Sequence, residues 1–403
     1  MQTITSTCVD FAEALAVARE GEVTRDAACT LIRARDGDEL DSLMSAASDL
    51  RNLFKGNRVT YSKKVFIPLT NLCRDYCGYC TFRKDPGQPG ARTMNPDEVL
   101  AVAEAGARLG CKEALFSLGD RPEAIFPEMR ETLARFGHRT TLSYLAEMCQ
   151  RVLNETGLLP HANPGLMGRK DLETLRRFNP SMGLMLESAS DRLTLPGMPH
   201  DNAPDKPPSL RLKTIEEAGR LKIPFTTGIL IGIGETLDER VDSLLAIREM
   251  HHRHGHIQEV IVQNFRAKPD IPMRNHAEPS QFDHARTIAV ARLVLRDMNV
   301  QAPPNLSDDD YPFLLRAGIN DWGGISPLTP DFINPEKPWP HLGRLAEKTS
   351  AEGFELRERL SVYPEFVHSD EFIDTRIRDR VRAMSDTRGL ATGSYVCMND
   401  LNR

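Results

Sequence analysis

No segment of this sequence is apolar over the roughly 18 to 20 residues that a helix needs to cross a bilayer. Residues 1–20 mix Asp, Glu and Arg with alanines and lack a continuous apolar core, so they predict neither a signal peptide nor a transit peptide. The formal net charge is −6 and the basic residues are scattered, which argues against a nucleic-acid partner. We therefore expect a cytoplasmic protein that acts on a small molecule, without a membrane partner.

The composition is also unlike that of a disordered chain. Of 403 residues, 40% are hydrophobic and 27% are charged, as in ordinary globular proteins. That length suits one (β/α) barrel with short extensions better than two average domains.

From Lys64 onward, short apolar runs alternate with longer amphipathic stretches, which is the pattern of βα units with a parallel sheet. Helix start signals lie between the runs: Asn95 precedes Pro96, and Thr236 with Glu239 forms a capping box. The predicted strands are residues 65–69, 114–118, 158–162, 183–187, 225–231, 259–264, 300–303 and 322–325.

Before the first predicted strand, apolar residues in 11–54 recur every three or four positions and predict two or three helices. The expected fold is thus α/β: a closed eight-stranded (β/α) barrel of the TIM type with an N-terminal helical extension. We expect the extension over residues 1–56, the barrel over 57–366, and a C-terminal helix and tail over 367–403.

Cysteine is scarce, but three of the eight cysteines lie close together. Cys73, Cys77 and Cys80 form C-x3-C-x2-C directly after the first predicted strand. Thiolates are favoured ligands of iron–sulfur clusters, and three ligands on four irons leave one iron open to another molecule. The isolated positions of the other cysteines predict buried thiols.

Two alternatives to a 4Fe-4S cluster stay open. A structural zinc ion needs a fourth Cys or His, and the next candidates along the chain are Cys111 and His138. Three unrelated thiols are the other alternative. The spacing favours the cluster over both.

The pattern C-x3-C-x-aromatic-C, with Tyr79 as the aromatic residue, resembles the radical S-adenosylmethionine (SAM) superfamily. The resemblance implies a radical SAM barrel in which SAM chelates the open iron. It also implies that an electron from reduced flavodoxin or ferredoxin cleaves SAM to methionine and a 5'-deoxyadenosyl radical. The protein then positions this radical and excludes water.

The superfamily binds SAM on motifs at the ends of later strands, and similar motifs occur here. Gly119 stands in the position of the glycine-rich motif, and Leu230 replaces the usual isoleucine of a G-x-I-x-G-x-x-E motif. An ordinary turn at Gly119, a helix N-cap at Ser188 or Ser190, and a tightly packed strand at Gly232 remain alternatives. The implied SAM-binding residues are Tyr79, Ser117, Gly119, Asp120, Glu187, Ser188, Gly232 and Ile233.

Further polar residues at strand ends are candidates for catalysis or substrate binding. Each of them could instead be a hydrogen-bonded loop cap. The candidates are His161, Asn163, Gln263, Asn264, Arg266, Asn305 and Asp321.

Residues 68–82, 118–123, 160–165 and 185–188 narrow the resemblance to the ring-closing subunits of 7,8-didemethyl-8-hydroxy-5-deazariboflavin (FO) synthases, over about residues 57–366. The implied enzyme is a lyase of deazaflavin coenzyme F420 biosynthesis. It converts 5-amino-5-(4-hydroxybenzyl)-6-(D-ribitylimino)-5,6-dihydrouracil and SAM into FO, 5'-deoxyadenosine, methionine and ammonia.

In some organisms this subunit is fused to a second radical SAM half that uses tyrosine to make the adduct. Only one C-x3-C-x2-C occurs here, so we expect a stand-alone subunit with a separately encoded tyrosine-using partner. The tyrosine-using subunit itself and a menaquinone-pathway enzyme are alternatives, and residues 118–123 favour neither. A non-catalytic iron–sulfur electron-transfer protein is another, but it would usually have a fourth cysteine ligand.

Overall fold

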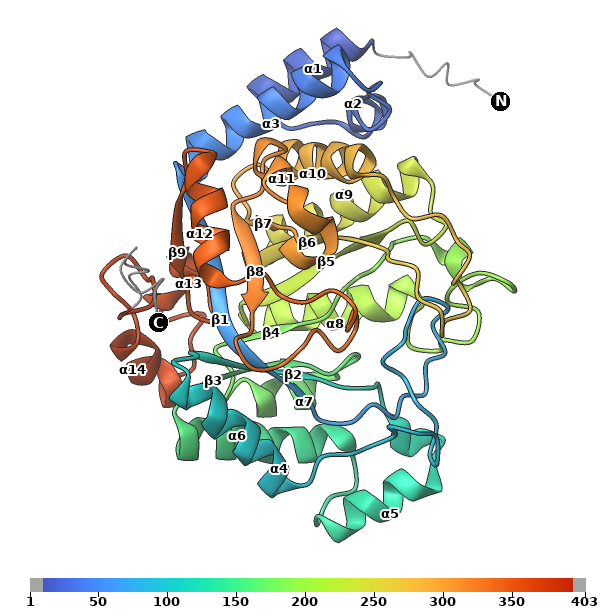
Figure 1. Cartoon of the computed structure of the whole chain (residues 1–403), viewed down its shortest axis with the longest axis vertical. Helices are drawn as coiled ribbons and strands as arrows, with labels where there is room; N and C mark the ends of the chain where they lie inside the picture. The colour runs from blue at the N-terminus through green and yellow to red at the C-terminus, as the bar shows by residue number, and fades with distance from the viewer. Residues whose placement is uncertain (1–9, 394–403) are drawn as a thin grey trace.

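The structure, a computed structural model, describes residues 10–393 and is built around a closed barrel of parallel strands (Figure 1). Each strand pairs with the next one along the chain, and β8 pairs with β1 to close the barrel. The expected eight-stranded closed barrel is confirmed. Its strands are β1 (Arg58–Pro68), β2 (Glu113–Ser117), β3 (Leu159–Asn163), β4 (Ser181–Gly183), β5 (Phe225–Ile231), β6 (Ile257–Asn264), β7 (Val300–Gln301) and β8 (Asp321–Ile325).

Helices cover the outside of the barrel, and further helices precede its first strand and follow its last one (Figure 1). The helix starts expected at Asn95 and Thr236 both form, and each has a capping box. The first helices are α1 (Phe11–Glu20), α2 (Arg25–Leu31) and α3 (Asp38–Lys55). Those between strands are α4 (Pro96–Arg108), α5 (Pro127–Arg135), α6 (Thr141–Thr156), α7 (Arg169–Leu175), α8 (Pro208–Arg220), α9 (Leu237–His254), α10 (Gln281–Leu295) and α11 (Phe313–Arg316). The last are α12 (Leu342–Ala351), α13 (Pro364–Val367) and α14 (Thr375–Ala383).

Residues 11–54 do form helices, and the longest of them, α3, packs against α10. Arg51 of α3 is buried and donates a hydrogen bond to the carbonyl of Ile319 over 2.9 Å. At the other end, α14 provides the expected C-terminal helix, and residues 394–403 of the predicted tail lie outside the described part of the chain. None of the helices in residues 10–393 has the length and apolar character needed to span a membrane.

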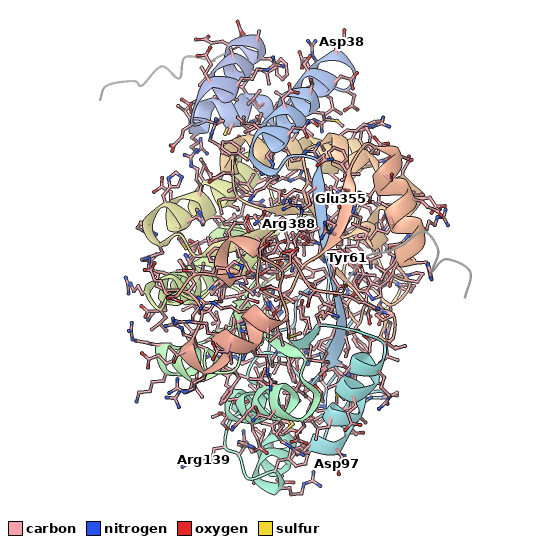
Figure 2. The ribbon with its side chains drawn as sticks, turned by 90° about the vertical axis from the view of Figure 1, so that its left-hand side faces the viewer. Asp38, Tyr61, Asp97, Arg139, Glu355 and Arg388 are labelled. Carbon is pink, nitrogen blue, oxygen red and sulfur yellow. The ribbon has the colours of Figure 1, made fainter. Side chains whose placement is uncertain are left out.

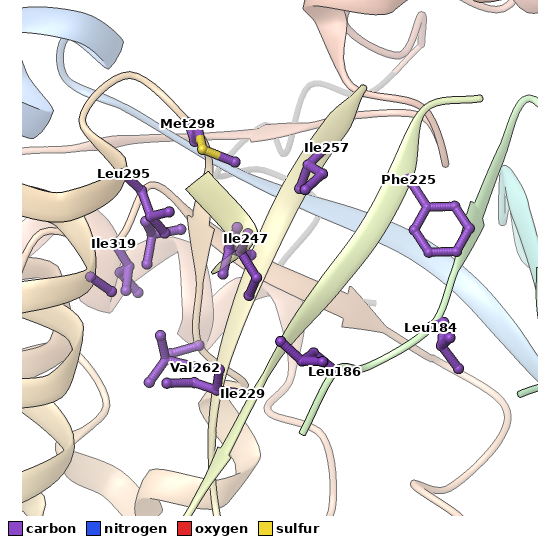
Figure 3. Close-up of a cluster of buried hydrophobic side chains, with 14 of the residues drawn as sticks. Leu184, Leu186, Phe225, Ile229, Ile247, Ile257, Val262, Leu295, Met298 and Ile319 are labelled. Atoms are coloured by element: carbon purple, nitrogen blue, oxygen red, sulfur yellow. The ribbon is translucent and has the colours of Figure 1, made fainter. Parts of the chain in front are cut away.

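Alternate residues of each strand face opposite sides of the barrel wall, and this alternation separates core from lumen. On β6, Val260 and Val262 turn outward into the main hydrophobic core, whereas Glu259 and Gln263 face inward. Figure 3 shows the outward set of β5 and β6 packed against Ile247 of α9 and its neighbours. The apolar core therefore lies between barrel and helices, and polar side chains enter the lumen.

The fourth strand begins and ends earlier than expected, at Ser181–Gly183 rather than at 183–187. The following residues still run beside β5, since the N–H of Glu187 donates to the carbonyl of Gly228 over 3.1 Å. Glu187, however, has a φ of 65°. This left-handed conformation ends the stretch of chain that runs beside β5. The Glu187 side chain therefore projects from the point where the chain stops running beside β5.

A ninth strand, β9 (Glu355–Glu358), was not expected from the sequence because it is short and mostly charged. It pairs in parallel with the first residues of β1, and Figure 2 shows Glu355 and Tyr61 on these neighbouring strands. β1 therefore pairs with three strands: β9 along its start, β8 along its middle and β2 along its end.

After β9, residues 359–363 pass beneath the N-terminal ends of the strands, and we call this segment the barrel floor. The N–H of Arg359 donates to the carbonyl of Tyr61 on β1 (2.8 Å), and the hydroxyl of Ser181 on β4 donates to the carbonyl of Ser361 (2.6 Å). The N–H of Tyr363 donates to the side-chain oxygen of Gln258 on β6 over 3.1 Å. These bonds fix the floor to strands on several sides of the barrel.

A buried ion network holds the floor in place. Arg359 pairs with Asp321 at 2.7 Å and with Glu259 at 3.1 Å, and the three side chains are at most 7% exposed. Thr60 and Tyr363 donate further hydrogen bonds to these carboxylates. Since a buried charge without a partner is costly, the network is a strong constraint on this end of the barrel.

Candidate active site

A cavity of about 260 Å³ opens at the C-terminal ends of the strands, and we call it the upper cavity. In (β/α) barrels this is the end where the βα loops bring functional groups together. Most of the predicted site residues line it, namely Cys73, Cys77, Tyr79, Cys80, Ser117, Gly119, Asp120, Asn163, Glu187, Gln263, Asn264 and Arg266.

The three cysteines of the motif project from the loop after β1 onto the wall of this cavity. The backbone N–H groups of Asp75 and Asp120 donate to Cys73 Sγ over 3.4 and 3.2 Å. Burial raises the pKa of the Cys77 thiol to about 12, so this thiol is neutral on its own. A coordinated metal deprotonates such thiols outright. The two amide donors then stabilise the negative charge on Cys73 Sγ.

The spacing of the thiols fits a cluster better than a single ion. In the described part of the chain, one trio of potential ligands has all its donor atoms within 4.8 Å, and it is Asp75, Asp120 and Asp205 rather than the cysteines. Thiols that stand farther apart can each take a separate iron of one cluster, whereas tetrahedral zinc needs converging ligands. Three soft sulfur donors around a cavity therefore fit a 4Fe-4S group with one open iron.

The other cysteines of the described chain stand apart from this wall. Cys111 and Cys149 are buried, as expected, whereas Cys29 is only half-buried. Cys8 and Cys397 lie outside the described residues.

Gly119 brings the loop after β2 directly against the cysteine loop. A Cβ atom at this position would lie 2.0 Å from the carbonyl oxygen of Leu72 and 2.6 Å from Cys73 Cβ. The N–H of Gly119 also donates to the carbonyl of Thr70 over 2.9 Å. Only glycine fits here without moving the backbone that carries Cys73.

We expect Gly119→Ala to lower iron content and to reduce turnover by about 100-fold, the scale of a 1 Å misplacement in an active site. Iron and sulfide per chain after anaerobic reconstitution are the measurement. Gly21→Ala is the matched control, because a Cβ there meets nothing within 4 Å and the φ of −157° suits alanine. Equal iron content in the two variants would show that the close approach has no role in cluster binding.

The trio of carboxylates lies beside the cysteine loop and ties several loops together. Asp205 pairs with Arg74 at 2.8 Å and also with Arg121, and its N–H donates to Asp75 over 2.9 Å. Asp120 accepts a hydrogen bond of 2.8 Å from the backbone N–H of residue 166. Burial, followed by the charge of Asp205, raises the pKa of Asp120 to about 7. These contacts give Asp120 a role in holding loops, whether or not it also contacts SAM.

Glu187 lies between two cations that the sequence does not reveal. Its Oε1 is 2.6 Å from Lys206 Nζ and 3.9 Å from a nitrogen of Arg211. Burial alone would raise the pKa of Glu187, but the two cations outweigh burial and lower it. The Lys206 ammonium also lies 5.7 Å from the ring centre of Tyr79, whose hydroxyl is 3.0 Å from His200 Nε2. Lys206 and Arg211 thus place two cations beside Glu187, and the Asp75 carboxylate of the same cavity also interacts with both of them.

Ser188, Gly232 and Ile233 are not among the residues that line the upper cavity. Ser188 Oγ accepts a hydrogen bond from the N–H of Ser190 over 3.1 Å, and Ser190 rather than Ser188 is the N-cap of the short helix that follows. The N–H groups of Gly232 and Ile233 donate to Glu235 over 2.8 and 2.9 Å. A Cβ on Gly232 would lie 2.3 Å from a proline ring, so packing accounts for this glycine.

Asn305 and Asp321 also lie away from the upper cavity. The Asn305 side chain donates to Asp331 and to the carbonyl of Lys337, so it holds the loop between β8 and α12. Asp321 is the first residue of β8 and therefore lies at the opposite end of the barrel, in the floor network. Its place before the strand already indicates that end, because all strands of a parallel barrel begin there.

Below the upper cavity lies a second one of about 200 Å³, which we call the lower chamber. The two share lining residues that include Ser117, Asn163 and Gln263, so they lie directly against each other and together make up the barrel lumen. His161 lines the lower chamber, with Nδ1 2.8 Å from Ser181 Oγ, and burial lowers its pKa to about 4. The imidazole is therefore neutral at ordinary pH, and the lumen extends from the thiols to the floor.

The fold is shared with two solved structures. Methylornithine synthase (PylB) superposes with a TM-score of 0.67 at 20% identity, over 85% of this chain and 97% of that one. The hydrogenase maturase HydG from Carboxydothermus hydrogenoformans superposes with a TM-score of 0.69 at 19% identity, over 93% and 86%. At such low identity the likeness concerns the barrel alone.

The sequence comparisons are more specific. The model of the radical SAM superfamily matches residues 67–247. A 7,8-didemethyl-8-hydroxy-5-deazariboflavin synthase from Methanopyrus kandleri is 50% identical over 333 residues, which are 83% of this chain and 99% of that protein. An FO synthase from Streptomyces avermitilis is also 50% identical, over 94% of this chain, but the chain spans only 45% of its length. The chain therefore belongs to the radical SAM superfamily and, within it, to the 7,8-didemethyl-8-hydroxy-5-deazariboflavin synthase family.

Proposed function

We propose that this chain closes the deazaflavin ring in FO synthesis. Its substrates are then 5-amino-5-(4-hydroxybenzyl)-6-(D-ribitylimino)-5,6-dihydrouracil and SAM. Its products are FO, 5'-deoxyadenosine, methionine and ammonia, which makes the enzyme a carbon–nitrogen lyase. The observation that carries the proposal is the wall of three thiols at the top of a lumen that the barrel floor covers below.

In this proposal Cys73, Cys77 and Cys80 hold the 4Fe-4S cluster. When bound, the cluster and SAM supply the 5'-deoxyadenosyl radical that removes a hydrogen atom from the substrate, with the starting electron from reduced flavodoxin or ferredoxin. Lys206 and Arg211 lie where their positive charge can hold the carboxylate of SAM, and Glu187 can pair with its amino group or ribose hydroxyls.

The lumen keeps water away from the reacting centre. The loop between β8 and α12 folds over it, with Trp339 stacked on Phe66 of β1 at a ring distance of 5.1 Å. Ile333 and Asn334 of the same loop line both the upper cavity and the lower chamber. Exclusion of water matters because a carbon radical abstracts hydrogen from any donor within reach.

The substrate adduct must come from a radical SAM unit that uses tyrosine. The FO synthase relatives are more than twice as long as the part that this chain matches. We propose that the tyrosine-using reaction belongs to a different unit from the one described here, because this chain has a single C-x3-C-x2-C.

The test is an anaerobic incubation of the reconstituted protein with SAM, a reductant and the adduct. We expect deazaflavin fluorescence to rise, with one ammonia and one 5'-deoxyadenosine released for each FO. A parallel incubation replaces the adduct with tyrosine and the ribityl-diaminouracil. Product formation from this second mixture alone would assign the tyrosine-using reaction to the chain and overturn the proposal.

A further inference from the structure

The lower chamber is lined by both polar and apolar side chains, and no step described above uses it. Its walls are inward-facing residues of the strands, and its lower end is covered by Arg359 and Ser361 of the barrel floor. At about 200 Å³ it has room for several water molecules or for a short polar chain. Because it adjoins the upper cavity, a ligand part can enter it from the thiol side.

Two buried polar atoms face this space without a partner. Gln301 Oε1 and Ser361 Oγ have no hydrogen bond among the described residues, although Gln301 is 4% and Ser361 1% exposed. Both residues line the lower chamber. An unsatisfied buried polar atom costs about 1–3 kcal/mol, so native proteins usually provide it with a ligand or an ordered water.

Two glycines of β8 keep this space open. A Cβ at Gly323 would lie 2.2 Å from Gln301 Nε2, and a Cβ at Gly324 would lie 2.2 Å from Lys64 Cε. Gly323 also has a φ of 73°, which favours glycine. The missing side chains thus leave the room into which Gln301 and Lys64 extend across the lumen.

Four of the charged side chains around the chamber form two ion pairs, and the remaining carboxylate, Asp331, accepts hydrogen bonds from the amides of Asn305 and Asn334. Lys64 Nζ lies 2.7 Å from Glu113, and Arg359 pairs with Glu259 at 3.1 Å. The imidazole of His161 is neutral, as described above. A phosphate or carboxylate would have to displace one of these pairs, whereas a neutral hydroxyl group can both donate and accept without disturbing them.

We propose that the lower chamber binds the ribityl chain of the substrate, with Gln301 and Ser361 accepting hydrogen bonds from its hydroxyl groups. This inference rests on the proposed function, since it assigns one part of that substrate to one part of the site. The pyrimidine ring then lies at the junction formed by Ser117, Asn163 and Gln263, directly below the thiols. The polyol thereby sets how far the reacting carbon stands from the cluster.

Calorimetric titration of the reconstituted protein tests the assignment with two fragments. One is 5-amino-6-(D-ribitylamino)uracil, and the other is 5-amino-6-(ethylamino)uracil, which lacks the polyol. We expect the wild type to bind the ribityl fragment at least about tenfold more tightly, and Gln301→Leu and Ser361→Ala to lower this ratio several-fold. Gln150→Leu, at an exposed helix position, is the matched control and keeps the ratio.

Ser361→Ala removes only one hydroxyl, so it answers the question if the larger change at Gln301 impairs folding. Equal affinities of the wild type for the two fragments would overturn the proposal, and so would an unchanged ratio in both variants. A clear ribityl preference without any FO formation would sink the proposed reaction and leave the polyol site standing. FO formation with no ribityl preference would support the proposed reaction and overturn the polyol site.

Discussion

Replacing Cys77 with alanine is expected to abolish cluster binding and turnover together. Cys77 is buried in the wall of the upper cavity, and its loop is fixed on both sides, since the N–H of Gly78 donates to the carbonyl of Pro199 over 2.8 Å. No neighbouring side chain of the described loop can replace its sulfur as a soft ligand without moving this backbone. Two remaining thiols hold a cluster too weakly for it to survive reconstitution.

Iron, sulfide and the low-temperature EPR signal of the reduced protein measure the loss, and 5'-deoxyadenosine formation measures turnover. Cys29→Ala is the matched control, because Cys29 lies on α2 of the N-terminal helices and away from the barrel mouth. It is expected to keep full iron and full activity. Full iron in Cys77→Ala would contradict the ligand assignment.

Replacing Arg359 with methionine is expected to destabilise the fold by about 3–5 kcal/mol, as when one partner of a buried ion pair is removed. The change leaves Asp321 and Glu259 buried without their cation. The floor also loses a side chain that connects it to both β6 and β8. Far-UV circular dichroism during urea unfolding gives the midpoint, which is expected to fall well below that of the wild type.

Arg316→Met makes the same change at the surface. Arg316 pairs with Glu352 at 2.8 Å, but its side chain is 62% exposed, and exposed pairs contribute about 0–1 kcal/mol. A midpoint for Arg359→Met that falls no further than the midpoint for Arg316→Met would show that the floor network adds little to stability.

The parts of the molecule with a strong local pattern could be predicted from sequence. The barrel could be predicted because short apolar runs alternate with longer amphipathic stretches. The cap at Asn95 and the capping box at Thr236 mark helix starts that the structure reproduces. The cysteine motif predicts its own loop, since the spacing is local and the preceding strand is apolar. Family membership followed from these motifs and is confirmed by the comparisons.

The groups that depend on tertiary pairing could not be predicted. Lys206 lies in a proline-rich loop with no periodic pattern, and only the folded chain brings it to Glu187. The charged residues of β9 and the floor resemble a solvated surface segment, yet Arg359 is 2% exposed in the folded protein. Asp321 shows the reverse case, because it begins β8 and so lies at the floor end of the barrel, although the sequence grouped it with polar residues that could contact substrate.

The pairing of β1 with β8 and β9 also sets how late in synthesis the barrel can close. Thr60 and Asp321, which are hydrogen-bonded across β1 and β8, are 261 residues apart. At about 5–20 residues per second, the ribosome delivers β8 roughly 15–50 s after β1. The cysteine loop after β1 therefore emerges from the ribosome long before the strand that closes the barrel around it.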